Sequence, residues 1–233
     1  MEVANKRIPY HSGEIFNFVV MLRDDETNPA KREDWHAPVS KSEILSKLSD
    51  FHPGILKVIS KATDFKRWPL LYRPPISTWH KDRLVLVGDA AHPMLPHHGQ
   101  GGAQAIEDGL ALGLVLSDLS SSSSSLSKEI EHRLNLYEKI RRNRASAIQV
   151  MSNAGFDETE AEAKAEAEAE AEAQKKELEG YLKKEGWEKG VIESMKELVE
   201  FEYGHDVVER TVRVMKEAVG EGWEVPRGFF PGL

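Results

Sequence analysis

The sequence predicts an α/β fold of the mixed α+β type, followed by long helices, and three features predict it. The apolar run Leu84–Val87 is typical of a strand that is buried on both faces, and it ends in Gly-Asp, where open α/β sheets bind ligands. A turn rich in glycine comes next, and a helix is expected from about Ala103 to Leu119. Apolar residues at helical spacing over residues 128–151 and 191–219 predict further helices.

The chain before these features is predicted to form strands and short helices. Residues 15–22 (IFNFVVML) are rich in aromatic and β-branched residues, which predicts a strand, and another strand is expected over residues 65–72. The sequence Ser-Lys-Ser-Glu at residues 40–43 has the pattern of a capping box, so a helix is expected to begin at Ser40. His-Pro-Gly at residues 52–54 is expected to end that helix, and a second short helix follows.

Composition and charge exclude several classes of function. The 233 residues are 40% hydrophobic and 30% charged, and the absence of cysteine excludes disulfide frameworks, cysteine zinc sites and thiol nucleophiles. Residues 157–179 hold ten acidic and three basic residues and so account for most of the net charge of −8. The sequence has no basic stripe, so it does not predict a nucleic-acid partner. The sequence shows neither a run long enough to span a membrane nor a signal-peptide core, so a cytoplasmic protein is expected.

The motif LVLVGDAAHPMLPHHGQGGAQAIEDG, at residues 84–109, has the chemistry of a cofactor site. Asp89 follows the predicted strand, and its carboxylate is suited to accept hydrogen bonds from sugar or ribityl hydroxyls, although it would repel a pyrophosphate. An aspartate that only caps the next turn is the alternative interpretation. Gly99, Gly101 and Gly102 let the backbone approach a ligand closely, and the helix after them points its positive end at that ligand.

Other site chemistries fit the motif less well. Three histidines lie in it, but prolines interrupt them and no acidic ligand is interleaved, so no metal site is predicted; they are His92, His97 and His98. The glycines fail the GxGxxG pattern because Gln104 stands at its sixth position. A phosphatase-type motif would need a second aspartate where the chain has Pro93, and no G-x-S-x-G elbow of a hydrolase is present.

As a whole, the motif resembles the second FAD-binding motif of the flavin-dependent aromatic hydroxylases, and it is most similar to that of the salicylate hydroxylase-like monooxygenases. In that family the Gly-Asp carboxylate binds the ribityl chain, which corresponds to Asp89 here. The loop that carries Pro96 passes beside the isoalloxazine ring, and the glycine turn faces the pyrimidine edge of the flavin. The resemblance therefore implies FAD as the cofactor, with these binding residues: Gly88, Asp89, Pro96, Gly99, Gln100, Gly101, Gly102 and Ala103.

The resemblance also implies an activity and its substrates. It extends to residues 10–20, 68–79, 137–155 and 201–207, so about two thirds of the chain is covered. A complete enzyme of this kind is an FAD-dependent monooxygenase, in which NAD(P)H reduces the flavin and O₂ supplies an oxygen atom to a small aromatic substrate. The alternatives are a non-catalytic remnant or partner fragment, and another flavin oxidoreductase of the same superfamily.

Two pairs of residues are candidates for a catalytic role. His97 or His98 is placed near the ring by the resemblance and is hypothesised to deprotonate or orient a phenol, against the alternative of two surface histidines on a loop. Arg141 and Arg144 share one side of a predicted helix. For these arginines we expect ion pairs with acids such as Glu107 or Asp108 rather than catalysis.

The chain is expected to consist of four segments, and the resemblance indicates what most of them are. Residues 1–78 are expected to be part of a β-sheet substrate-binding domain, and residues 79–156 the C-terminal part of a three-layer FAD/NAD(P)-binding domain. Residues 157–180 are a Glu/Ala-rich insertion. Within it, Glu and Ala alternate over residues 158–172, which are predicted to be a solvated helix or disordered because a period of two leaves no apolar stripe on a helix. Residues 181–233 are expected to be a C-terminal helical region. No GxGxxG motif precedes residue 84, so the chain is interpreted as the C-terminal portion of such an enzyme.

Overall fold

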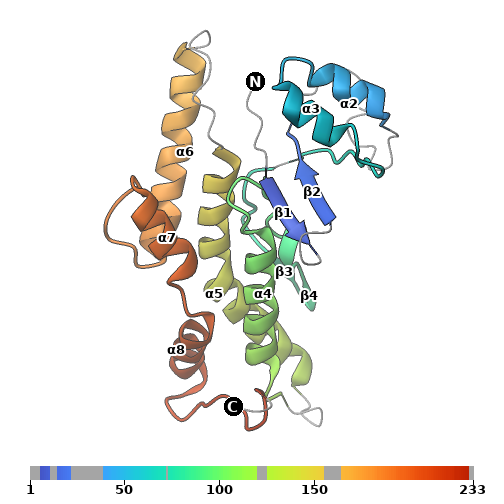
Figure 1. Ribbon diagram of the computed structural model, residues 1–233. Helices are drawn as coiled ribbons and strands as arrows, with labels where there is room; N and C mark the ends of the chain where they lie inside the picture. The colour runs from blue at the N-terminus through green and yellow to red at the C-terminus, as the bar shows by residue number, and fades with distance from the viewer. Residues whose placement is uncertain are drawn as a thin grey trace. The chain divides into compact units, whose positions relative to one another are not determined.

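The computed structural model describes most of the chain as two compact units, Met1–Leu70 and Leu71–Leu233. The residues that it describes are 6–10, 15–21, 39–71, 73–119, 125–154 and 164–230. Helices predominate and the strands are few and short (Figure 1), which confirms the mixed α+β class. The finer division into four parts stays a prediction.

The first unit contains a strand pair and two short helices. β1 (Lys6–Tyr10) pairs in antiparallel register with β2 (Ile15–Val19), so the strand predicted over residues 15–22 is confirmed over its first part. α2 (Lys41–Lys47) begins where predicted, because the Ser40 hydroxyl accepts a hydrogen bond from the Glu43 N–H at 3.1 Å.

One expectation for this unit is confirmed and another is wrong. The second short helix is present as α3 (Pro53–Ile59), and it begins at the proline itself, because proline is well tolerated in the first turn of a helix and the His52 side chain caps it. The strand expected over residues 65–72 is absent from residues 65–71, which are irregular. Pro69 lacks the N–H that a strand ladder needs, and no described strand pairs with this segment.

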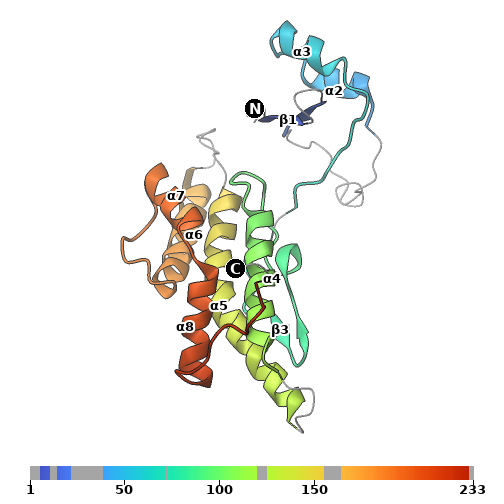
Figure 2. The ribbon, with the colours of Figure 1, turned by 60° about the horizontal axis from the view of Figure 1, so that its bottom comes forward.

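The second unit is built around two adjacent helices (Figures 1 and 2), α4 (Gly101–Leu116) and α5 (Leu126–Ala154). Three further helices follow in the sequence: α6 (Lys164–Lys184), α7 (Met195–Tyr203) and α8 (Val207–Val219). α5 packs against α4, α6 and α8. Within the described residues, no helix is long and apolar enough to cross a membrane.

The 29 residues of α5 connect two apolar clusters of this unit. Tyr137 and Ile140 pack with residues of α4 and α8 in the first cluster, and Ile148 and Met151 pack with residues of α6 and α7 in the second. The apolar face predicted for this helix is therefore confirmed. The face holds α4 in place, and α4 carries the glycine end of the motif.

The strand predicted at Leu84–Val87 is shorter and more exposed than expected. Among the described strands, β4 (Leu84–Val85) pairs only with β3 (His80–Lys81), antiparallel to it, and Leu84 is 69% exposed. A strand is buried on both faces only where neighbouring strands and helices cover it, and the described residues supply one two-residue neighbour. The chain then turns through the 3₁₀ helix η2 (Gly88–Ala90), which contains the Gly-Asp pair.

The Glu/Ala-rich segment forms part of α6. Residues 171–177 of this helix are all exposed, which includes the last two residues of the alternating tract that was predicted to be solvated. Further along, Leu178 and Leu182 are buried against α5 and anchor the helix. Residues 155–163, which hold the start of the predicted insertion, lie outside the described residues.

Candidate functional site

Gly88 and Asp89 form a tight turn at the end of β4. Gly88 has a φ of 59°, a conformation that glycine adopts without strain, while a Cβ on it would lie 3.4 Å from the Ala105 Cβ, in ordinary van der Waals contact. Asp89 is exposed and makes no hydrogen bond within the described part of the chain. Its carboxylate therefore does not cap the turn, in contrast to the alternative interpretation of the sequence.

The N-terminus of α4 lies beside this carboxylate. The Gln100 side chain does not cap the helix, and the N–H groups of Gly101, Gly102 and Ala103 have no acceptor among the described residues. The Asp89 Oδ1 is 3.9 Å from the position that a Cβ on Gly101 would occupy. An acceptor of hydrogen bonds and a row of donors thus lie together, at the positive end of a 16-residue helix.

The loop between the turn and α4 is held by the last turns of α5. The Gln149 side chain donates to the Pro93 carbonyl at 2.9 Å, and the Leu95 N–H donates to the Asn153 side chain at 3.0 Å. His97 Nδ1 lies 2.9 Å from the Ser152 carbonyl oxygen. Because a carbonyl oxygen only accepts, Nδ1 carries the proton and donates it, which leaves Nε2 as the acceptor in the neutral ring.

His98 and Gln100 are held by a different element, α7. His98 Nδ1 donates to Glu202 Oε1 at 2.6 Å, and the Gln100 amide donates to Glu202 Oε2 at 3.4 Å. Glu202 is 7% exposed. Sequence reasoning did not identify this residue. The signal available was its place in the segment 201–207, which resembles the C-terminal segment of the family.

Asp108, in α4, is a buried carboxylate with three hydrogen-bond donors around it. It accepts from the Gly88 N–H at 3.0 Å, from His92 Nε2 at 2.6 Å and from Arg141 Nε at 2.8 Å. Burial raises its pKa, but the hydrogen bond from His92 and the charge of Arg141 outweigh burial and hold the pKa below its usual range. His92, for which the sequence predicted no metal role, is buried against Trp79, with ring centres 5.2 Å apart.

Arg141 and Arg144 form the ion pairs that the sequence predicted. Arg141 binds both Glu107 and Asp108, and Arg144 Nε donates to Glu107 at 2.9 Å. Burial raises the pKa of Glu107, yet the hydrogen bond from Arg144 and the two arginine charges lower it overall. Arg144 also donates to the carbonyls of Phe201 and Glu202 at 2.8 and 2.9 Å, which ties the end of α7 to α5.

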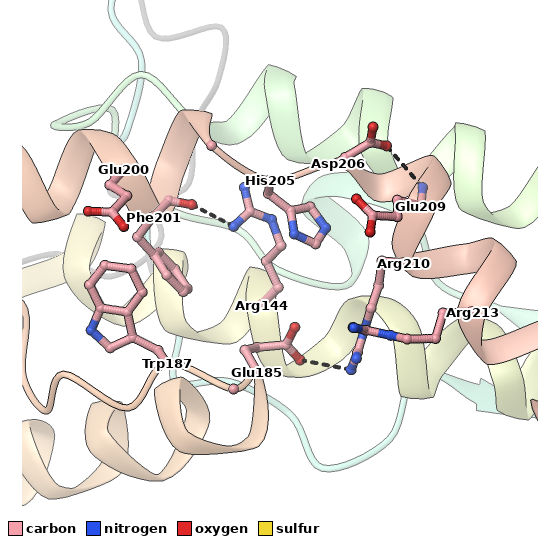
Figure 3. A pocket seen from close by; sticks show the side chains of 12 residues that line it. Arg144, Glu185, Trp187, Glu200, Phe201, His205, Asp206, Glu209, Arg210 and Arg213 are labelled. Carbon is pink, nitrogen blue, oxygen red and sulfur yellow. Dashed lines mark hydrogen bonds and ion pairs between the residues drawn. The ribbon is translucent and has the colours of Figure 1, made fainter.

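A cavity of about 310 Å³ lies next to this network, where α5 and α6 meet the junction of α7 and α8. Figure 3 shows Arg144 between His205 and Glu185 in this cavity, with Arg210 paired to Glu185. Burial and the nearby arginines lower the pKa of His205 to about 4, while burial raises the pKa of Glu185. Arg144 lines this cavity, but none of the predicted FAD-binding residues and neither loop histidine does.

Comparison with known proteins identifies the family. A family model described as an FAD binding domain matches residues 7–152. The chain belongs to this family of FAD-binding domains. The curated relatives include the FAD-dependent monooxygenase cfoG of Aspergillus candidus, which is 46% identical over 65% of this chain and 34% of the relative. They also include the 6-hydroxynicotinate 3-monooxygenase of Pseudomonas fluorescens, 40% identical over 49% of this chain and 28% of the relative.

A solved structure shows the same fold. The salicylate hydroxylase substrate complex superposes with a TM-score of 0.56 at 21% identity, over 89% of this chain and 46% of the solved chain. This match confirms the expected fold, that of part of an FAD-binding hydroxylase. This FAD-binding domain spans about a third of the length of the curated relatives that it matches.

The donors and acceptors at the motif fit the FAD of this family. An exposed carboxylate on Asp89 suits hydroxyl groups, and the unpaired N–H groups at the start of α4 suit the electronegative edge of a flavin ring. A Cβ on Gly102 would meet nothing within 4 Å, so the helix start is open to a ligand. The FAD-binding domain thus presents suitable groups where its sequence motif predicts them.

Proposed function

We propose that this chain forms the ribityl- and ring-contacting side of the FAD site in an NAD(P)H-dependent monooxygenase that hydroxylates a small aromatic substrate. The observation that carries the proposal is the position of the Asp89 carboxylate, 3.9 Å from the side-chain position of Gly101 at an uncapped helix N-terminus. Membership of the FAD-binding domain family and the names of the relatives support it.

Each part of the motif has a role in this proposal. FAD, when bound, carries electrons from NAD(P)H to O₂ and so supplies the redox chemistry. Asp89 accepts hydrogen bonds from the ribityl hydroxyls, and the N–H groups from Gly101 to Ala103 stabilise negative charge that gathers at the pyrimidine edge of the ring. Gly88 and Gly99 provide positive φ angles on either side of the loop that carries Pro96.

The two loop histidines are proposed to handle the substrate proton. His97 keeps its Nδ1 proton on the Ser152 carbonyl, so its Nε2 can take a proton from a phenol. His98 is oriented by Glu202, because the carboxylate requires a proton on Nδ1. Either ring acts by deprotonating or orienting the phenol, and deprotonation makes the aromatic ring more electron-rich before hydroxylation.

The relatives suggest a class of substrate. The name of one of them specifies 6-hydroxynicotinate, which is a small aromatic ring with a hydroxyl and a carboxylate. We propose ring-hydroxylated aromatic acids as the first substrates to test. Salicylate has the same two groups and matches the family resemblance of the motif.

The first experiment measures FAD binding by the full chain, from the quenching of flavin fluorescence. Saturable binding is expected, and Asp89→Asn should raise Kd about tenfold because it removes a charged acceptor of hydrogen bonds. Asp82→Asn is the matched control, since Asp82 is exposed in the β3–β4 turn and asparagine tolerates its φ of 53°. Absence of binding, or equal effects of the two substitutions, contradicts the proposal.

The second experiment measures NADH and NADPH oxidation by the FAD-loaded chain with 6-hydroxynicotinate and with salicylate. Substrate-dependent oxidation with a product heavier by one oxygen atom in mass spectrometry is expected. Saturable FAD binding without any turnover favours the alternative of a non-catalytic partner fragment. Turnover without oxygen transfer favours another flavin oxidoreductase.

A further inference from the structure

A single carboxylate oxygen holds both ends of the turn that carries Asp89. Asp108 Oδ2 accepts from the Gly88 N–H at 3.0 Å and from His92 Nε2 at 2.6 Å. The turn is also closed on itself, because the His92 N–H donates to the Gly88 carbonyl at 2.9 Å. Asp89 lies between these two residues, so its backbone cannot move far without breaking a bond to Asp108.

The other oxygen of this carboxylate is held from the opposite side. Arg141 Nε donates to Asp108 Oδ1 at 2.8 Å, and both side chains are 0% exposed. With both oxygens engaged, the carboxylate has one orientation. It therefore acts as a fixed acceptor for the turn rather than as a mobile counter-charge.

Asp108 and the N-terminus of α4 belong to the same helix. Gly101 is the first residue of α4, and Asp108 lies about two turns further along it. Because a helix is stiff over this length, a turn bound to Asp108 is also held at a set distance from Gly101. This explains why the Asp89 carboxylate stays beside the unpaired N–H groups although it makes no bond of its own in the described part of the chain.

We propose that Asp108 is the positioning residue of the FAD site, which holds Asp89 in place over the start of α4 for the ribityl hydroxyls. This inference rests on the function proposed above. Asp108 does not touch FAD in this proposal and acts only through the turn. Its contribution is to order the Asp89 backbone before FAD arrives, so that binding does not incur that entropy cost.

The test replaces Asp108 and compares it with its neighbour. Asp108→Asn leaves one acceptor oxygen for three donors, so at least one donor faces the new amide group, and Kd for FAD should rise about tenfold. Glu107→Gln is the matched control, because it also removes a negative partner of Arg141, while Glu107 makes no contact with the turn. This control should keep Kd within about threefold of wild type.

A double-mutant cycle separates positioning from general stability. If Asp108 acts through Asp89, then Asp89→Asn weakens FAD binding much less in the Asp108→Asn chain than in wild type. Effects that multiply, or an equal loss in Glu107→Gln, overturn the inference and leave the proposed function intact. If wild type itself binds no FAD, the proposed function fails and this inference fails with it.

Two further measurements cover a variant that folds poorly. Hydrogen exchange of the Gly88 amide needs no FAD, and it should be faster in Asp108→Asn than in Glu107→Gln; equal rates contradict the inference. If circular dichroism shows that Asp108→Asn is unfolded, His92→Phe takes its place in the cycle. This substitution has no donor, so it removes one bond to the turn but leaves the pair of Asp108 and Arg141 in place.

Discussion

Glu202 in α7 accepts a hydrogen bond from His98 Nδ1 at 2.6 Å, across 104 positions of the sequence. The same carboxylate accepts from the Gln100 amide, one residue before α4 begins. Glu202 lies outside residues 7–152, which match the FAD-binding domain model. The C-terminal helices therefore help to shape a motif that belongs to the matched domain.

This relationship predicts a loss of stability when the Glu202 side chain is removed. Glu202→Ala leaves His98 Nδ1 and the Gln100 amide without this acceptor in a buried place, which should lower the free energy of unfolding by about 1–3 kcal/mol. Glu200→Ala is the control on the same helix, because its ion pair with Lys189 is about half exposed and is worth about 1 kcal/mol or less. Urea unfolding measures both, and equal losses would contradict the prediction.

Gly102 offers a prediction in which stability and cofactor binding change in opposite directions. It is an exposed residue in the first turn of α4, and an added Cβ meets nothing within 4 Å. Gly102→Ala should therefore stabilise the helix by up to about 1 kcal/mol, while the methyl group occupies space that the proposed site gives to FAD. We expect a higher melting temperature together with a higher Kd for FAD.

Gly109 provides the matched control for this substitution. It is also exposed in α4, and its added Cβ also meets nothing within 4 Å. Gly109→Ala should raise the melting temperature in the same way but leave Kd for FAD unchanged. If both alanines weaken FAD binding equally, or neither does, FAD does not approach Gly102.

The lowered pKa of His205 should make the free energy of unfolding depend on pH. Its pKa falls from 6.5 to about 4 because burial and the charges of Arg144, Arg141 and Arg210 outweigh the attraction of Glu107. Between these two values the unfolded chain binds a proton that the folded chain does not. The free energy of unfolding should therefore fall as pH is lowered from 6.5 towards 4, by about 3 kcal/mol at full effect.

The substitution His205→Gln should remove this part of the pH dependence. Denaturant unfolding at several pH values between 6.5 and 4.5 measures it, and the difference from wild type isolates His205 from Glu185, whose raised pKa acts in the opposite direction. His132→Gln is the control, since His132 is exposed on α5 and its loss should leave the curve as in wild type. A curve unchanged by His205→Gln would show that His205 is not buried in its neutral form.

The elements that the sequence predicted well depend on local signals. The helix at Ser40 begins with a hydrogen bond that spans only three positions, and α4 begins close to the predicted residue because a glycine turn precedes it. The strands were predicted less well, since a strand needs neighbours from elsewhere in the chain. Leu84 is mostly exposed because only β3 lies beside it among the described strands.

In the candidate site, too, local features were predicted well and contacts between distant residues were not. The motif alone predicted Asp89 and the glycines as an FAD site, and the spacing of Arg141 and Arg144 along one helix predicted their ion pairs. The sequence did not predict that His92 is buried against Trp79 and hydrogen-bonded to Asp108 in α4. That arrangement depends on how the chain before the turn packs against the helices.

By itself, the sequence determined the family and the approximate start of α4, and it predicted the FAD motif at Asp89, because each of these signals lies within one short stretch of chain. Only the tertiary structure decided which buried carboxylates hold that motif in place. Asp108 reaches back to the turn, and Glu202 reaches the loop from the far end of the chain. The physical reason is that a hydrogen bond depends on distance in space, and the packing of α4, α5 and α7 sets that distance.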